Sequence, residues 1–291
     1  MQANTRQYLL IFQIFWLAIS CSQGNAAETS FVRFIPGALA WEGELQTAVV
    51  SYENADGVVV DLVSAIHLGE EEYYAALNKY FLDRDAVLYE LVAHEDVRPN
   101  PESVTQSISL VSFVQRALGN FLDVKFQLEQ IDYSPQNFIH ADLNPDELRQ
   151  IMLEKDESFL SMFIALAIAQ LADEQAASQQ GEQVSSFNAI AIVNALLAED
   201  QTAAFKYLFA EELGRTDGII VAPELESQIT ILGDRNNAAL KVLEETLSDT
   251  DIRTISIFYG AAHMPRFERE LLERFGFKQI QKRWLNAWIM P

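Results

Sequence analysis

Two long apolar runs, far apart in the sequence, dominate the hydrophobic pattern of this chain. Residues 58–67 and 254–263 are both rich in β-branched and apolar side chains, narrow to small residues, and end on a histidine. Continuous apolar runs of this kind predict strands that are buried on both faces, as in a parallel sheet. We therefore expect His67 and His263 at the ends of two core strands.

Strand and helix signals alternate around the first run. Residues 31–41 and 46–52 are strand-like, and residues 54–57 have the Asn-Ala-Asp-Gly sequence of a hairpin turn. A helix with acidic residues in its first turn is expected over 70–83, and a second core strand over 86–92. This order is a βαβ unit, whose crossover implies parallel strands.

The middle of the chain has helical periodicity instead. The expected helices cover residues 103–118, 145–175, 187–215 and 234–247, and the expected exposed loop, rich in Gln, Ser and Ala, covers 175–186. Apolar stretches inside these helices are shorter than the roughly 20 residues that span a bilayer, so we assign them to buried helix faces. After the second run, a helix is expected over 266–275 and a strand over 277–289.

These elements predict an α/β fold in which both ends of the chain build one sheet. We expect a central mixed or mostly parallel sheet in a single domain of residues 27–291, with a helical insertion over about 100–233. Ligands of open α/β sheets bind outside the carboxyl ends of the strands. The two strand-end histidines are therefore expected to converge there.

Three further side chains are candidates for chemistry. Glu90 interrupts the apolar strand over 86–92, so it must pair, coordinate a metal or reach a cavity, unless it faces outward. Arg235 follows Asp234, a predicted N-cap, and an arginine in a first helical turn opposes the helix dipole. It is expected either to face an anionic group or to be solvated. His140 lies at the edge of a predicted helical segment, and His94 lies in a charged, solvated loop.

His67, Glu90 and His263 together suit either a divalent metal or a proton-transfer site, although strand-end histidines can also be structural. Other chemistries lack their motifs: the chain has no glycine-rich phosphate loop, no His-Glu-x-x-His helix and no Gly-x-Ser-x-Gly elbow. The single cysteine, Cys21, lies in the N-terminal apolar segment, which excludes cysteine catalysis in a processed chain.

The first 26 residues are typical of a signal peptide. Arg6 is the only charge before Glu28, residues 8–19 form an apolar core, and small residues precede a cleavage point before Ala27. We expect an exported protein, periplasmic or secreted. The alternative is a lipoprotein that is anchored to a membrane through Cys21.

The net charge of −22 argues against nucleic acid as a partner, because phosphate contacts need clustered Lys and Arg. It argues equally against an anionic membrane surface, so membrane contact is expected only if Cys21 is lipidated. A peptide or a small molecule is the expected substrate, and the oligomeric state is open.

Four segments resemble, in order, the TraB/PrgY/GumN group. They are Ser-Ala-Ile-His at 64–67, Leu-Tyr-Glu-Leu at 88–91, Asp-Arg-Asn at 234–236, and Gly-Ala-Ala-His-Met-Pro at 260–265. The group includes the TIKI proteases, whose hallmark is two Gly-x-x-His motifs, a glutamate strand and an arginine near the second motif. The second motif fits fully, whereas the first has Ser64 where the family has glycine.

The resemblance implies an α/β fold of the erythromycin-esterase and ChaN-like type. From the TIKI branch it implies metal-dependent proteolysis with manganese or cobalt. The metal ligands would be His67, His263 and Glu90, with His140 as a further candidate, and Glu90 could instead be the general base. Arg235 would orient Glu90 or stabilise an oxyanion. We therefore expect an exported metal-dependent hydrolase of the peptidase type, or alternatively a protein that binds a peptide or small ligand without turnover.

Overall fold

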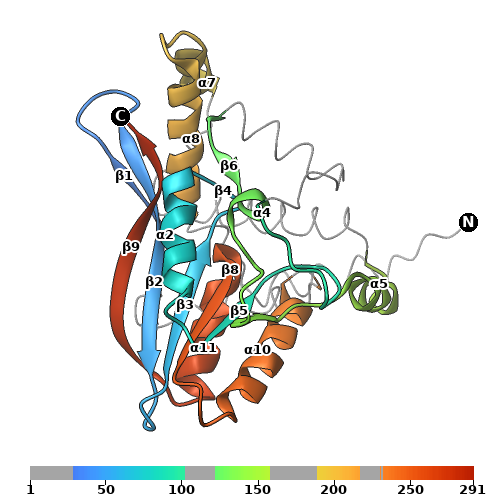
Figure 1. Ribbon diagram of the computed structural model, residues 1–291. Helices are drawn as coiled ribbons and strands as arrows, with labels where there is room; N and C mark the ends of the chain where they lie inside the picture. The colour runs from blue at the N-terminus through green and yellow to red at the C-terminus, as the bar shows by residue number, and fades with distance from the viewer. Residues whose placement is uncertain (1–28, 102–121, 158–188, 217–229, 231) are drawn as a thin grey trace, which may run out of the picture.

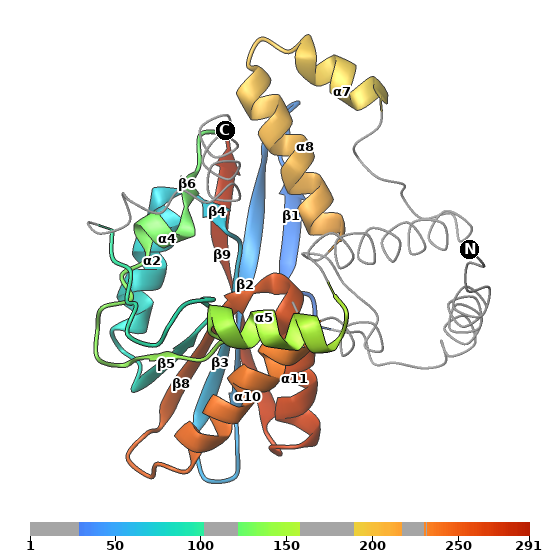
Figure 2. The ribbon, with the colours of Figure 1, turned by 90° about the vertical axis from the view of Figure 1, so that its right-hand side faces the viewer.

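The computed structural model describes residues 29–101, 122–157, 189–216, 230 and 232–291. Within these residues a mixed sheet forms the middle layer, with helices on both sides of it (Figures 1 and 2). The strand order is β1–β2–β3–β8–β5–β7, and β9 also pairs with β2. The strands are β1 (Val32–Pro36), β2 (Gly43–Glu53), β3 (Val59–Ala65), β5 (Ala86–Tyr89), β7 (Phe138–His140), β8 (Thr254–Gly260) and β9 (Lys278–Met290).

A small second sheet pairs β4 (Leu68–Gly69) with β6 (Lys125–Phe126). The described helices are α2 (Glu71–Phe81), α4 (Gln127–Gln130), α5 (Pro145–Glu154), α7 (Ala189–Leu196), α8 (Gln201–Arg215), α10 (Gly233–Leu247) and α11 (Met264–Glu273), with a 3-10 turn η2 (Ala261–His263). None of these helices combines the length and the apolar character that a membrane crossing needs.

One half of the large sheet is antiparallel and is built by a local hairpin. The expected turn joins β2 to β3, and the Asn54 carboxamide oxygen accepts hydrogen bonds from the backbone N–H groups of Asp56 and Val58. Gly57 has a φ of 76°, a conformation that most other residues avoid. The expected C-terminal strand, β9, pairs antiparallel with the other edge of β2 and so joins the two ends of the chain.

The other half is parallel and carries the two apolar runs. β8 pairs in parallel with both β3 and β5, and β5 pairs in parallel with β7. The predicted crossover from β3 through α2 to β5 is therefore present. However, the two strands are not neighbours, because β8 from the C-terminal region lies between them. The parallel direction brings the carboxyl ends of β3, β8, β5 and β7 to one edge.

Two apolar layers hold the helices to the sheet. On one face, α2 contributes Tyr73, Tyr74, Leu77 and Phe81 to a cluster that also receives residues from α8. On the other face, α10 and α11 contribute Leu240, Leu243, Phe267 and Leu271 to a second cluster. The sheet is therefore buried on both faces along its parallel half, as the continuous apolar runs predict.

Several expected boundaries are corrected by the structure. The helix expected over 187–215 is two helices, because Asp200 caps α8 by accepting from the backbone N–H of Ala203. Asp234 is not an N-cap, since α10 begins at Gly233 and Asp234 forms an ion pair with Lys155. His140 ends a short strand instead of bordering a helix.

α5 ends at Glu154, within the single helix expected over 145–175, and β1 ends at Pro36, within the strand expected over 31–41. His94 is exposed in a loop, as expected. The helix expected over 103–118, the loop expected over 175–186, the signal peptide and Cys21 lie outside the described residues. The α/β class and the sheet built from both chain ends are confirmed, whereas the ChaN-like form of the fold stays a prediction.

Candidate active site

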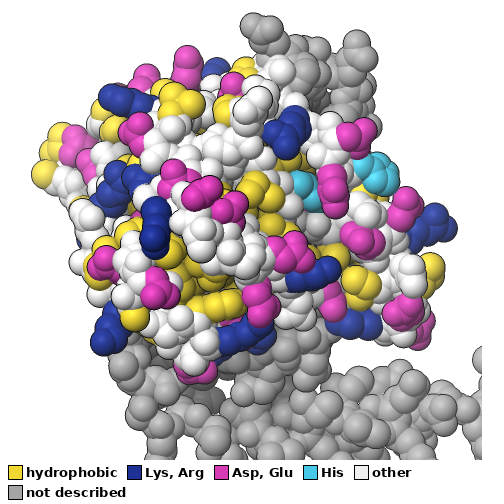
Figure 3. All heavy atoms as spheres, turned by 60° about the horizontal axis from the view of Figure 1, so that its bottom comes forward, with side chains coloured by type: hydrophobic (Ala, Val, Ile, Leu, Met, Phe, Trp, Pro, Cys, Tyr) yellow, Lys and Arg dark blue, Asp and Glu magenta, His cyan; other side chains and the backbone are white. Residues whose placement is uncertain are grey.

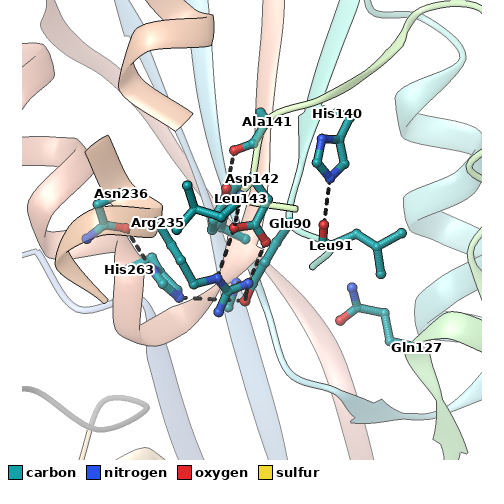
Figure 4. Close-up of polar contacts among 12 residues, drawn as sticks. Glu90, Leu91, Gln127, His140, Ala141, Asp142, Leu143, Arg235, Asn236 and His263 are labelled. Carbon is teal, nitrogen blue, oxygen red and sulfur yellow. Dashed lines mark hydrogen bonds and ion pairs between the residues drawn. The ribbon is translucent and has the colours of Figure 1, made fainter. Parts of the chain in front are cut away.

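Polar side chains from distant segments gather at the carboxyl edge of the parallel strands (Figure 4). Glu90 directly follows β5, Asp142 follows β7, and Gly260 and His263 come at and just after the end of β8. Arg235, from the first turn of α10, lies among them, and it contacts residues that are 93 and 145 positions away in sequence.

Arg235 is the centre of the charged cluster. Its Nε and Nη2 donate to the two carboxylate oxygens of Asp142 at 2.9 and 2.6 Å, and Nη2 also donates to Glu90 Oε1 at 2.7 Å. Burial alone would lower the pKa of Arg235, but Glu90 and Asp142 raise it. The predicted alternative in which Arg235 faces an anionic group is therefore confirmed, and the solvated alternative is wrong.

Glu90 is held as an anion by its neighbours. Its Oε1 accepts from Arg235, and its Oε2 accepts from the backbone N–H of Gly260 at 2.6 Å. Burial by itself would raise the pKa of Glu90, but the charge of Arg235, together with those of His263 and His67 when their rings are protonated, lowers it well below its usual range. Glu90 is therefore ionised, and each of its carboxylate oxygens accepts a hydrogen bond.

His263 is oriented by one partner and faces another. Its Nδ1 lies 2.6 Å from Asn236 Oδ1, and because a carboxamide oxygen can only accept, Nδ1 carries the hydrogen. Its Nε2 lies 3.6 Å from Glu90 Oε1. The ring packs edge-on against Tyr259 and stacks on Phe267, so it is only 4% exposed. The imidazole is therefore fixed in a single orientation.

A side chain at Gly260 would crowd Glu90. A Cβ on Gly260 would lie 3.3 Å from Glu90 Oε2 and 3.8 Å from His263 Cδ2. We expect Gly260→Ala to move the carboxylate by a few tenths of an ångström and to lower the free energy of unfolding by about 1 to 3 kcal/mol, because the added Cβ crowds a buried side chain. Thermal melting of the variant and the wild type checks this. An unchanged melting temperature would contradict it.

The other expected site residues lie at the same edge but are not in the cluster. His67 is exposed in the bend after β3, and its carbonyl accepts from the backbone N–H of Gln127 at 2.9 Å. His140 is half-buried, and its Nε2 lies 2.6 Å from the carbonyl oxygen of Leu91. β8 separates the strand that leads to His67 from the strand that leads to Glu90.

Asp142 and Asn236 belong to the candidate site, but the sequence patterns did not single out either of them for a role. Asn236 follows Arg235 and is fully buried, and Asp142 follows a strand of only three residues. An available signal was the position of Asp142 directly after the apolar segment that ends at Ala141. A three-residue strand is too short to establish a periodicity, so that signal was weak.

The described residues do not fit a three-ligand metal site. In the described part of the chain, no three His, Cys, Asp or Glu side chains gather in a group that could hold a metal ion. Glu90 and His263 lie together, but Oε1 of Glu90 is already paired with the Arg235 guanidinium. The metal requirement, together with His67 and His140 as ligands, stays a prediction.

Comparison of the chain with known protein families, with curated proteins and with solved structures finds no match. The resemblance to the TraB/PrgY/GumN group therefore rests on the four short segments alone. Function has to be argued from the geometry of the site.

A separate cavity of about 420 Å³ lies beside the C-terminal end of β9. Five of its 14 lining residues are acidic, and one of these, Glu70, has its Oε1 2.6 Å from Nζ of the buried Lys206. None of the cluster residues lines this cavity. Among the described residues, buried and mutually oriented acid–base groups meet at the carboxyl ends of parallel strands at the Glu90 cluster, and we place the candidate site there.

The cluster can transfer a proton and can balance the resulting charge. With His263 neutral, the two carboxylates and one guanidinium leave one net negative charge. A proton on His263 therefore brings the formal charge of the cluster to zero, and the new cation faces Glu90 at 3.6 Å.

Proposed function

We propose that this protein is a hydrolase that cleaves peptide bonds at the cluster of Glu90, Arg235 and His263. One observation carries the proposal: Asn236 fixes the proton on His263 Nδ1, which leaves Nε2 as the basic nitrogen beside an ionised glutamate. A histidine that is held in this way suits general acid–base catalysis.

His263 is the base of the proposed reaction. A water within reach of Nε2 gives up a proton to that nitrogen while its oxygen forms a bond to the carbonyl carbon of the scissile bond. The bond from this carbon to the leaving nitrogen then breaks, and the proton passes from Nε2 to that nitrogen. Glu90 pairs with the imidazolium between these two steps.

We assign the base to His263 in preference to Glu90. The pKa of Glu90 is well below its usual range, and both of its oxygens already accept hydrogen bonds, so it is a poor proton acceptor near neutral pH. Arg235 donates to two carboxylates, which supports the first of its two expected roles, the orientation of Glu90.

Family membership and export are also part of the proposal. Membership of the TraB/PrgY/GumN group and export to the periplasm or medium agree with the sequence motifs. Binding of a peptide without turnover is the second candidate, and the full occupation of both Glu90 oxygens favours it. On the face in Figure 3, Lys and Arg side chains lie between Asp and Glu side chains, so that face carries charges of both signs.

A peptide library tests the proposed activity. We expect the wild type to cleave a subset of hexapeptides, measured by mass spectrometry with EDTA and, separately, with manganese, cobalt or zinc. His263→Gln should abolish the cleavage, and His94→Gln, in an exposed loop, should retain it. Cleavage in the presence of EDTA would show that no metal ion is required. Cleavage only with an added ion would support the metal requirement. Binding without cleavage under every condition favours the second candidate.

Export has an independent test. We expect the protein isolated from its native host to have the mass of a chain that begins at Ala27. A mass that begins at Cys21 with added acyl chains selects the lipoprotein alternative. An intact N-terminus contradicts both forms of processing.

A further inference from the structure

The last strand, β9, forms an outer edge of the large sheet. Among the described residues it pairs with β2 alone, and β2, β3 and β8 separate it from β5 and the Glu90 cluster. It runs along one margin of the sheet in Figure 1. In an antiparallel pair, alternate residues bond to the neighbouring strand, and the residues between them turn their N–H and C=O groups away from it. β9 therefore presents a row of backbone groups to one side.

One end of this edge is already filled. The carbonyl of Ala287 accepts from the backbone N–H of Glu70 at 3.0 Å, and the N–H of Ile289 donates to Glu70 Oε1 at 2.8 Å. Lys206 Nζ donates to the carbonyl of Ile289 at 3.4 Å. The other end, residues 278–286, has no second strand beside it in the described part of the chain. Residues 278–281 and Asn286 are exposed, so a partner can reach this open part of the edge.

The open part of the edge is basic, although the protein as a whole is strongly acidic. β9 holds Lys278, Lys282 and Arg283 and no acidic residue, in a chain that has 42 Asp and Glu against 20 Lys and Arg. Arg33 adds a further cation, with its guanidinium carbon 4.1 Å from the centroid of the Trp284 ring. Even with Glu53 opposite Lys278 on β2, these described residues have a net positive charge.

We propose that residues 278–286 bind an extended acidic segment of a partner protein, which adds a strand to the sheet beside β9. Open backbone groups at a sheet edge select a polypeptide in the extended form. The cations along the strand favour Asp and Glu in that polypeptide. Charges farther apart than about 8 Å are largely screened at physiological salt, so the local positive charge outweighs the negative charge of the whole protein.

A second copy of this chain is a poorer occupant of the same edge. Pairing of β9 with β9 would bring together three cations from each copy and no carboxylate from either strand. Like charges directly opposite each other destabilise a pair of strands, and lysines on an edge strand are a common protection against self-association. The charge pattern therefore disfavours a copy and favours an acidic partner.

Fluorescence anisotropy with a labelled heptapeptide, in which glutamate alternates with valine, tests the proposal. The control probes are the same peptide with lysine in place of glutamate, and the same peptide with alternate backbone amides N-methylated. We expect the wild type to bind the glutamate probe at least about tenfold more tightly than either control, since each control loses charge attraction or several hydrogen bonds. Binding of the glutamate probe should weaken as salt is raised.

Two variants with matched controls test the edge itself. Ile280 is 53% exposed and falls at a bulge where it has no partner on β2, so proline there removes an N–H and leaves the pairing with β2 intact. Ile280→Pro should weaken binding about fivefold, the effect of one hydrogen bond, and Ile280→Thr should not. Lys278→Gln should weaken it about threefold, the effect of one exposed ion pair. Lys241→Gln, exposed on α10, should leave it unchanged.

Amide hydrogen exchange locates the bound probe. We expect slower exchange over residues 278–286 and unchanged exchange over 88–91 and 260–265. Protection of the latter segments instead would place the acidic peptide at the Glu90 cluster and would overturn the proposal. Equal binding of the lysine probe, or no binding of the glutamate probe, would overturn it as well. A wild-type dimer in sedimentation with β9 protected in the absence of any probe would show that a second copy occupies the edge.

Discussion

Replacing Arg235 with methionine will lower the free energy of unfolding by about 3 to 5 kcal/mol at neutral pH, the usual effect of removing one partner from a buried ion pair. Methionine fills a volume similar to that of arginine, so the loss of stability comes from the missing positive charge. The variant leaves the carboxylates of Glu90 and Asp142, whose side chains are 9% and 0% exposed, without their shared cation. Denaturant unfolding measures the change.

The stability of Arg235→Met should change with pH in the opposite direction to that of the wild type. In the wild type the pKa of Glu90 is depressed, so its contribution to stability is present above the unfolded value of about 4.3 and is lost as pH falls through the folded value. Without Arg235, burial raises the pKa of Glu90. The variant should therefore regain stability as pH is lowered from 7 toward 5.

Arg274→Met is the matched control. Arg274 pairs with Glu244 at 2.6 Å, but the two side chains are 47% and 60% exposed, so its removal should cost less than about 1 kcal/mol. If Arg235→Met lowers the free energy of unfolding by no more than this control, the guanidinium does not hold the cluster together, and the proposed orientation of Glu90 is wrong.

Replacing His263 with glutamine will lower the turnover of a peptide substrate by about 10²- to 10⁴-fold, the usual contribution of a general acid–base group. Glutamine is preferable to alanine, because the ring packs between Tyr259 and Phe267 and truncation would open a gap in the core. Turnover and melting temperature should be measured together.

Glu90→Gln, measured in the same way, separates a role of Glu90 in turnover from a role in stability. The variant keeps the shape of the side chain and leaves Arg235 paired with Asp142, so the melting temperature should fall less than in Arg235→Met. Turnover should still fall, because the imidazolium of His263 loses its counter-charge. A large loss of stability with unchanged turnover would show that Glu90 is structural, and the proposed mechanism would lose its anion.

The sequence determined the elements whose signals are local. The apolar runs over 58–67 and 254–263, the turn over 54–57 and the acidic start of α2 each give a pattern within one element, and the structure has each of them. Glu90 and Arg235 were also identifiable, because a charge in an apolar strand or at an unfavourable helix end needs a partner wherever it lies.

Only the tertiary structure decided which partners those charges have. The insertion of β8 between β3 and β5 brings His263 and Gly260 to Glu90 and leaves His67 outside the cluster, and no periodicity encodes the order of strands in a sheet. Asp142 and Asn236 gain their roles from contacts made across the sheet edge. A sequence pattern shows that a buried charge must be compensated, but the compensating residue is selected by packing of segments that are far apart in the chain.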